Sequence, residues 1–114
     1  MTSLVDRTRE FSLRVIRLYA ALPRNRVAVV LGDQLLRAGT SPGAHFREAL
    51  RARSKAEYVS KLNGGLMELE ETLYWLELLG SAEVFPLDRI TPLMQETNAL
   101  IAIFVTLIKK WKKG

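Results

Sequence analysis

Apolar side chains recur at helical spacing in four successive stretches of this sequence. The first runs from about Leu4 to Leu22, and alternating steps of four and three residues place its regular positions on one helical face. Pro23 ends this helix because the residue before a proline is pushed out of the α region, and Asn25 is a suitable cap for the next helix. The face predicted to be buried consists of Leu4, Thr8, Phe11, Val15, Leu18 and Leu22.

The second stretch begins near Arg26 and contains Gly39-Thr40-Ser41-Pro42-Gly43, a composition typical of a loop. The apolar spacing nevertheless continues through this segment. An interior proline costs roughly 3 kcal/mol, which packing on both sides can offset. The pattern therefore favours one kinked helix over two short helices. Its predicted buried face consists of Leu31, Leu35, Ala38, Phe46 and Ala49.

The third stretch starts at Ser54-Lys55-Ala56-Glu57, which fits a capping box in which a hydroxyl and a carboxylate each accept a hydrogen bond from a free backbone N–H. Gly64-Gly65 interrupts the helix and predicts close approach by a neighbouring helix. Gly80 is predicted to end it in the left-handed conformation. Its leucines follow a coiled-coil-like spacing at Leu62, Leu66, Leu69, Leu73 and Leu76.

The fourth stretch begins near Asp88 and runs to about Lys110, with Pro92 in its first turns, where a missing N–H is tolerated. Four amphipathic helices without strand-like alternation predict an all-α fold, an antiparallel up-down four-helix bundle with its second helix kinked near Gly39-Gly43. The chain is expected to form a single domain, residues 1–114. The fourth buried face is predicted to consist of Ile90, Met94, Thr97, Ile101, Phe104, Ile108 and Trp111.

Composition narrows the chemistry that such a bundle can perform. The sequence has no cysteine and a single histidine, His45, which we expect to be a packed structural residue. A di-iron bundle needs Glu-x-x-His motifs, and none occurs. We therefore predict that the protein is not an enzyme and has no catalytic residues, metal site or cofactor. Tyr74 and Trp75 are expected to pack in the core or at a subunit interface rather than to stack on bases.

The chain is expected to be cytoplasmic and off the membrane. Its first residues lack the apolar core of a signal peptide. Its most apolar run, from Ala99 to Ile108, is about ten residues, half of what a membrane span requires. The segment Ile101–Lys113 is apolar and then lysine-rich, a pattern that also suits an anionic membrane surface, but its stripe follows the bundle period, so burial explains it first.

Charge is divided unevenly along the sequence. Residues 7–61 contain 12 basic and 4 acidic side chains, whereas residues 62–108 contain a single basic side chain and 7 acidic ones. Lysines return at the C-terminal end, and the net charge of the whole chain is +5. Such a division favours a polyanion at one surface, or contacts between copies of the protein.

The best candidates for nucleic-acid contacts lie in and near the basic run before Ser54. They are Arg37, Arg47, Arg51, Arg53 and Lys55. Positions 47, 51 and 55 share one face if the helix continues through them, and could meet phosphates there. The alternative is that Arg47 and Arg51 pair with Glu48, Glu57 or the acidic third helix. Arginine binds carboxylate and phosphate equally well in bidentate geometry, so residue type alone does not decide.

The segment Gln34–Leu79 resembles a known bacterial family. The resemblance rests on Gln34-Leu35-Leu36-Arg37, Thr40-Ser41-x-Gly43-Ala44, Arg47-Glu48-Ala49, the run from Arg51 to Glu57, Ser60-Lys61-Leu62, the run from Glu68 to Thr72 and the run from Tyr74 to Leu79. The family is the four-helix-bundle proteins encoded in intervening sequences of 23S ribosomal RNA genes. The accessory variability proteins of diversity-generating retroelements are similar. His45 stands where this family usually has asparagine.

The resemblance implies a bundle assembled as a ring, with a homopentamer expected. It also implies nucleic-acid binding and, for the retroelement branch, a reverse transcriptase as partner. It implies no catalytic residues. Two hypotheses follow: a non-enzymatic oligomer that binds RNA or DNA through phosphates without reading bases, or a protein–protein adaptor that assembles with a partner enzyme and binds no nucleic acid.

Overall fold

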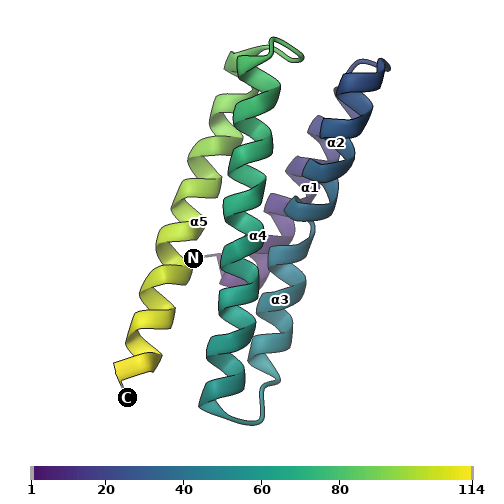
Figure 1. Ribbon diagram of the computed structural model, residues 1–114. Helices are drawn as coiled ribbons and strands as arrows, with labels where there is room; N and C mark the ends of the chain where they lie inside the picture. The colour runs from purple at the N-terminus through teal and green to yellow at the C-terminus, as the bar shows by residue number, and fades with distance from the viewer. Residues whose placement is uncertain (1, 114) are drawn as a thin grey trace.

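The computed structural model describes residues 2–113 and gives side chains as far as Lys112. The described chain is almost entirely helical and forms an elongated rod of 47 × 22 × 22 Å (Figure 1). Helices α2 and α3 follow each other along one arm, so the chain makes four antiparallel arms and the predicted all-α four-helix bundle is confirmed. The helices are α1 (Leu4–Ala21), α2 (Arg26–Gly39), α3 (Ser41–Leu50), α4 (Lys55–Ser81) and α5 (Leu87–Lys113).

The first arm, α1, follows the sequence pattern closely. The Ser3 hydroxyl caps its start by accepting a hydrogen bond from the Asp6 N–H at 3.1 Å. Leu22, before Pro23, has extended backbone angles, which ends the helix as predicted. Thr8, Phe11, Val15 and Leu18 are buried, and Leu4 and Leu22 are half-buried at the two ends of the stripe.

The second arm is interrupted near Gly39-Gly43 as predicted, but it consists of two helices that meet at Thr40 and not of the one kinked helix that the pattern favoured. Pro42 lies in the first turn of α3, where its missing N–H costs little. The Thr40 and Ser41 hydroxyls donate to the carbonyls of Leu36 and Arg37, each at 2.7 Å, and satisfy acceptors at the end of α2. Gly39 lies so close to α1 that an added Cβ would be 2.7 Å from the Val15 methyl groups.

The central arm, α4, packs on α2, α3 and α5. Its cap is half of the predicted box: the Ser54 hydroxyl accepts from the Glu57 N–H at 3.1 Å, but the Glu57 carboxylate accepts from the Arg53 N–H at 3.3 Å. The prediction that the regularly spaced leucines of this helix are buried is only partly correct, because Leu66 and Leu73 are half-buried. The fully enclosed positions are Leu62, Gly65, Leu69, Thr72, Leu76 and Leu79.

Close approach at Gly64-Gly65 is confirmed. A Cβ added to Gly64 would lie 2.8 Å from Cε1 of His45, and one added to Gly65 would lie 2.6 Å from Cε2 of Phe104. The two glycines therefore admit the His45 ring from α3 and the Phe104 ring from α5 against the backbone of α4. His45 is a packed residue, as expected.

The predicted left-handed cap at Gly80 is wrong. Helix α4 continues through Gly80 to Ser81, and the residue with a positive φ, 58°, is Glu83. Gly80 lies against α5 instead, where an added Cβ would be 2.9 Å from Cδ1 of Leu87. The glycine at this position serves packing, and the turn is closed by hydrogen bonds from Val84 and Phe85 N–H groups to the Leu79 carbonyl.

The last arm, α5, begins at Leu87, so Asp88, near which the helix was predicted to begin, lies in its first turn. Trp111 was predicted to be buried, but it is 40% exposed. By length and composition α5 is the single described helix that could cross a membrane, and 28% of its apolar stretch is buried in the bundle. The absence of membrane contact therefore stays a prediction. Its fully buried positions are Ile90, Leu93, Thr97, Leu100, Phe104 and Ile108.

Candidate nucleic-acid interface

The basic run lies at the turn between α3 and α4. Because α3 ends at Leu50, the expectation that positions 47, 51 and 55 share one helical face is wrong. Arg47 is in the last turn of α3, Arg51 caps its end, and Lys55 opens α4. Their side chains therefore extend from a turn at one end of the bundle and do not form a stripe along it.

The four cations of this turn are free of ion pairs within the described chain. Arg47, Arg51, Arg53 and Lys55 are exposed, and none has a carboxylate oxygen of residues 2–112 within 4.0 Å. The nearby carboxylates have other partners: Glu48 accepts from Lys61 at 3.2 Å. The pairing of Arg47 and Arg51 within one chain, which the sequence left open, is not formed.

Arg37 behaves differently from the other four candidates. Its guanidinium bridges α2 to α4 by binding Glu71 at 2.6 Å and Glu68 at 3.4 Å. The hydrogen bond that Arg37 donates to Glu71, and the charges of both carboxylates, raise the pKa of Arg37. Arg37 therefore already has anionic partners, and the fold does not bring it to the turn that carries the other candidates.

Lysines from the C-terminal end of α5 join the same end of the bundle (Figure 1). The Trp111 ring is 5.4 Å from the Tyr58 ring, centroid to centroid, and the Lys55 Nζ lies 6.0 Å from the Trp111 centroid. A shallow pocket of about 410 Å³ opens there between Leu50, Tyr58 and Trp111. We call this surface the basic end; its cations are Arg47, Arg51, Arg53, Lys55, Lys109, Lys110 and Lys112.

Antiparallel packing was the signal that could have joined these lysines to the basic run. If α5 runs antiparallel to α4, its C-terminal end must lie beside the start of α4. From the sequence, these lysines were described as the end of the segment Ile101–Lys113 and were not grouped with the basic run. The grouping therefore follows from topology and not from local sequence.

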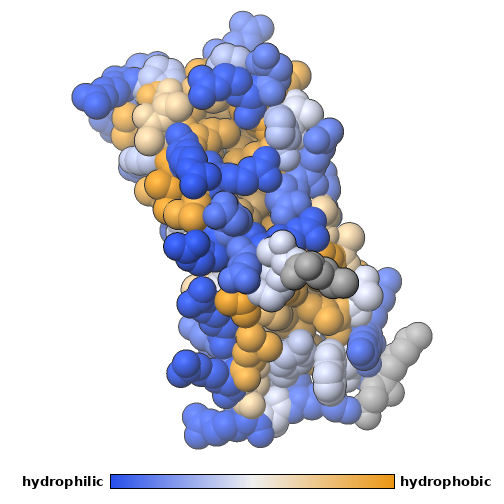
Figure 2. All heavy atoms as spheres, turned by 180° about the vertical axis from the view of Figure 1, so that it is seen from behind, coloured by the Kyte–Doolittle hydropathy of each residue, from blue (hydrophilic) through white to orange (hydrophobic). Residues whose placement is uncertain are grey.

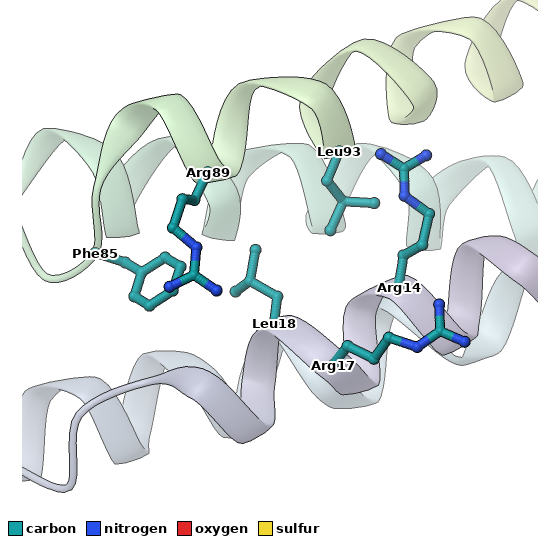
Figure 3. Close-up of a pocket in the computed structure, with 6 residues that line it drawn as sticks. All are labelled: Arg14, Arg17, Leu18, Phe85, Arg89 and Leu93. Carbon is teal, nitrogen blue, oxygen red and sulfur yellow. The ribbon is translucent and has the colours of Figure 1, made fainter.

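A second group of cations was missed altogether. Arg14 and Arg17 from α1 and Arg89 from α5 line a depression of about 210 Å³, with Arg89 at one end and the other two arginines toward the opposite end (Figure 3). The Arg89 guanidinium lies over the Phe85 ring, 4.7 Å from its centroid. We call this depression the arginine groove; its lining is Arg14, Arg17, Leu18, Phe85, Arg89 and Leu93. These residues are about 70 positions apart in sequence, and no local pattern connects them.

An ion pair bounds the arginine groove on one side. Arg7 on α1 donates two hydrogen bonds to the Glu96 carboxylate on α5, both at 2.8 Å. The hydrogen bond from Arg7 is the main cause of a lowered pKa at Glu96, and the positive charge of Arg14 adds to it. Both carboxylate oxygens of Glu96 are therefore already bound by Arg7.

The described residues contain no group of three His, Cys, Asp or Glu side chains that could hold a metal ion. Two buried nitrogen atoms, His45 Nδ1 and Trp75 Nε1, have no hydrogen-bond partner. Trp75 packs against the core as expected, with the Tyr74 ring at 5.3 Å, whereas Tyr74 itself is 54% exposed. The surface groups that could contact a ligand are therefore cationic side chains and exposed aromatic rings.

Fold and surface together define a small helical-bundle protein with two clusters of unpaired cations. A family model described as 23S rRNA-intervening sequence protein matches residues 2–106, and the chain belongs to that family. A solved structure similar to it is a protein of unknown function from the S23 ribosomal protein family of Bacteroides thetaiotaomicron. The two share 36% identity and a TM-score of 0.88 over 94% of this chain and 99% of that chain. None of the curated proteins compared with the chain matches it.

Proposed function

We propose that the protein is a non-enzymatic nucleic-acid-binding bundle that contacts RNA or DNA phosphates through the basic end without reading bases. The observation that carries this proposal is the meeting of seven exposed cations from α3, α4, α5 and the intervening turn at one end of the rod. Phosphate neutralisation by such cations releases condensed counterions, which drives binding without sequence information.

The arrangement of these side chains supports phosphate contact over base readout. Arg51 and Arg53 lie in a turn, so no helix or strand presents them in the fixed array that reading groove edges requires. Trp111 offers an exposed ring beside Lys55, and stacking on an aromatic ring tolerates every base. Both features favour a sequence-independent contact.

The test is fluorescence anisotropy with labelled RNA and DNA strands of about 20 nucleotides, titrated from about 50 to 200 mM salt. Binding is expected to weaken steeply with salt, and Arg51→Gln/Arg53→Gln is expected to weaken it further. The matched control is Arg9→Gln/Arg26→Gln, which removes two exposed and unpaired arginines outside the basic end. Absence of binding at low salt, or binding that ignores salt, would reject the proposal.

The protein is also proposed to self-associate, as a homopentamer. Support comes from apolar side chains left on the surface of one chain, visible as patches among hydrophilic residues on the face seen from behind (Figure 2). The large exposed ones are Ile16, Val27, Val29, Val30, Leu50, Met67, Tyr74, Leu87 and Trp111. Light scattering should give five times the 12.9 kDa chain mass, and a monomer at micromolar concentration would contradict this.

Exposed apolar side chains on α4 support a second candidate function, a protein–protein adaptor for a partner enzyme such as a reverse transcriptase. Met67 and Tyr74 are on α4, and each exposes more than half of its surface. An adaptor would form a fixed oligomer and bind no nucleic acid. The anisotropy titration therefore separates the two functions.

A further inference from the structure

The arginine groove holds three positive charges that form no ion pair within the described chain. No carboxylate of residues 2–112 lies within 4.0 Å of Arg14, Arg17 or Arg89. The nearest acidic partner for this region, Glu96, is occupied by the bidentate contact with Arg7. Placing three like charges around one depression costs repulsion, which an anionic ligand would relieve.

The two walls of the groove belong to different helices and are held at a fixed separation. The Arg7–Glu96 pair links α1 to α5 on one side. On the other side, the Arg89 guanidinium lies over the Phe85 ring, 4.7 Å from its centroid, and its N–H groups remain free to donate. The groove is therefore preorganised by contacts of the folded chain, which reduces the entropy lost on binding.

The guanidinium groups are distributed along the groove and do not converge on one point. Figure 3 shows Arg89 at one end, over Phe85, and Arg14 and Arg17 toward the other end, with Leu18 and Leu93 between them. Such an arrangement suits successive anionic groups joined by a less polar linker. A depression of about 210 Å³ admits part of a single strand, whose backbone bends into a hollow more easily than that of a stiff duplex.

We propose that the arginine groove binds the phosphodiester backbone of a single nucleic-acid strand, with Arg89 on one phosphate, Arg14 and Arg17 on another, and the intervening sugar against Leu18 and Leu93. This inference rests on the proposed nucleic-acid binding but places a second contact far from the basic end. It makes the protein a binder of single strands in preference to duplexes.

The test compares the full-length protein with Arg17→Gln/Arg89→Gln in anisotropy titrations against a single strand and the matching duplex. Each lost charged hydrogen bond is expected to weaken single-strand binding by roughly tenfold. The salt slope should also fall by about 0.7 for each phosphate no longer contacted. The control Arg9→Gln/Arg26→Gln removes equal charge outside the groove, and Arg17→Lys/Arg89→Lys keeps the charge while losing bidentate geometry.

Weakened binding in the Gln variant, partial recovery in the Lys variant and little change in the control would support the groove as the site. Equal weakening in groove and control variants would overturn it in favour of general electrostatic attraction. Unchanged binding in the groove variant, with weakening at Arg51→Gln/Arg53→Gln, would overturn this inference and leave the proposed function intact.

Discussion

Arg7 on α1 and Glu96 on α5 form a bidentate ion pair, with both N–O distances at 2.8 Å. The pair joins two arms that are 89 residues apart in sequence and make few other contacts. Glu96 is mostly covered, with 19% of its side chain exposed, so the pair is partly protected from solvent screening. It is a side-chain link that closes the bundle between its first and last helices.

Breaking this link should destabilise the fold in a pH-dependent way. Because Arg7 lowers the pKa of Glu96, the pair stabilises the protein above the unfolded carboxyl pKa of about 4.3 and loses this contribution as pH falls through the folded value. Glu96→Gln should lower the free energy of unfolding by about 1 kcal/mol at about pH 7, and by less at about pH 2. Urea unfolding at both pH values measures this, with exposed Glu10→Gln as control. A deficit that is equal at both pH values would contradict the assignment.

Gly65→Ala should destabilise the bundle. The added methyl would meet the Phe104 ring at 2.6 Å, and overpacking of this kind costs about 1–3 kcal/mol, more than the gain of about 1 kcal/mol in helix propensity. Gly80→Ala is the control, because its methyl would meet the movable Cδ1 of Leu87. Thermal unfolding should rank Gly65→Ala below wild type and Gly80→Ala close to it. The reverse order would mean that Phe104 can move aside.

Arg37→Ala should leave nucleic-acid binding nearly unchanged. Its guanidinium already binds Glu68 and Glu71, and the side chain is 52% exposed, so its loss should cost at most about 1 kcal/mol of stability. The anisotropy titration would compare it with Arg51→Ala, a single change of equal charge at the basic end. A larger loss of binding from Arg37→Ala would place the interface on the α2–α4 face.

Strand binding should quench the fluorescence of Trp111. The chain has two tryptophans, and Trp75 is half-buried on α4 whereas Trp111 is exposed beside Lys55. Stacking on a base is worth about 1–3 kcal/mol, so Trp111→Ala should weaken binding by about tenfold or more. Trp111→Phe retains a stacking surface but removes the signal. Quenching that persists in Trp111→Phe would assign the contact to Trp75.

Helical periodicity predicted the bundle, because core positions such as Phe11, Leu69 and Phe104 follow the helical repeat that burial imposes. The interruption at Gly39-Gly43 was predictable from its glycines and proline, but the division of the arm into two helices was not, because the apolar phase continued through it. The residues that cap the helices and form the turns were harder to predict. Gly80 has the composition of a left-handed cap but serves helix packing, and only the position of Leu87 on α5 distinguishes the two roles.

The residues of the candidate site also differ in how far local sequence could predict them. The basic run was visible as a run of charge, but whether Arg47 and Arg51 had carboxylate partners depended on where α3 ended. The arginine groove depends on α1 and α5 lying side by side, with Arg14 and Arg89 far apart in sequence. Pairings between the first and last arms are a property of topology, and no local pattern reports them.

Glu83 occupies the left-handed region with φ of 58°, a conformation that costs a residue with a Cβ roughly 1 kcal/mol or more. The chain therefore has its glycine three positions before the residue whose backbone would benefit from one. Nothing in the described fold holds Glu83 in an ion pair, so the acidic side chain gives no compensation in return. Replacing Glu83 with glycine or asparagine should therefore raise the melting temperature of the protein. The exchange lies in the turn between α4 and α5 and changes no residue of the two cationic surfaces.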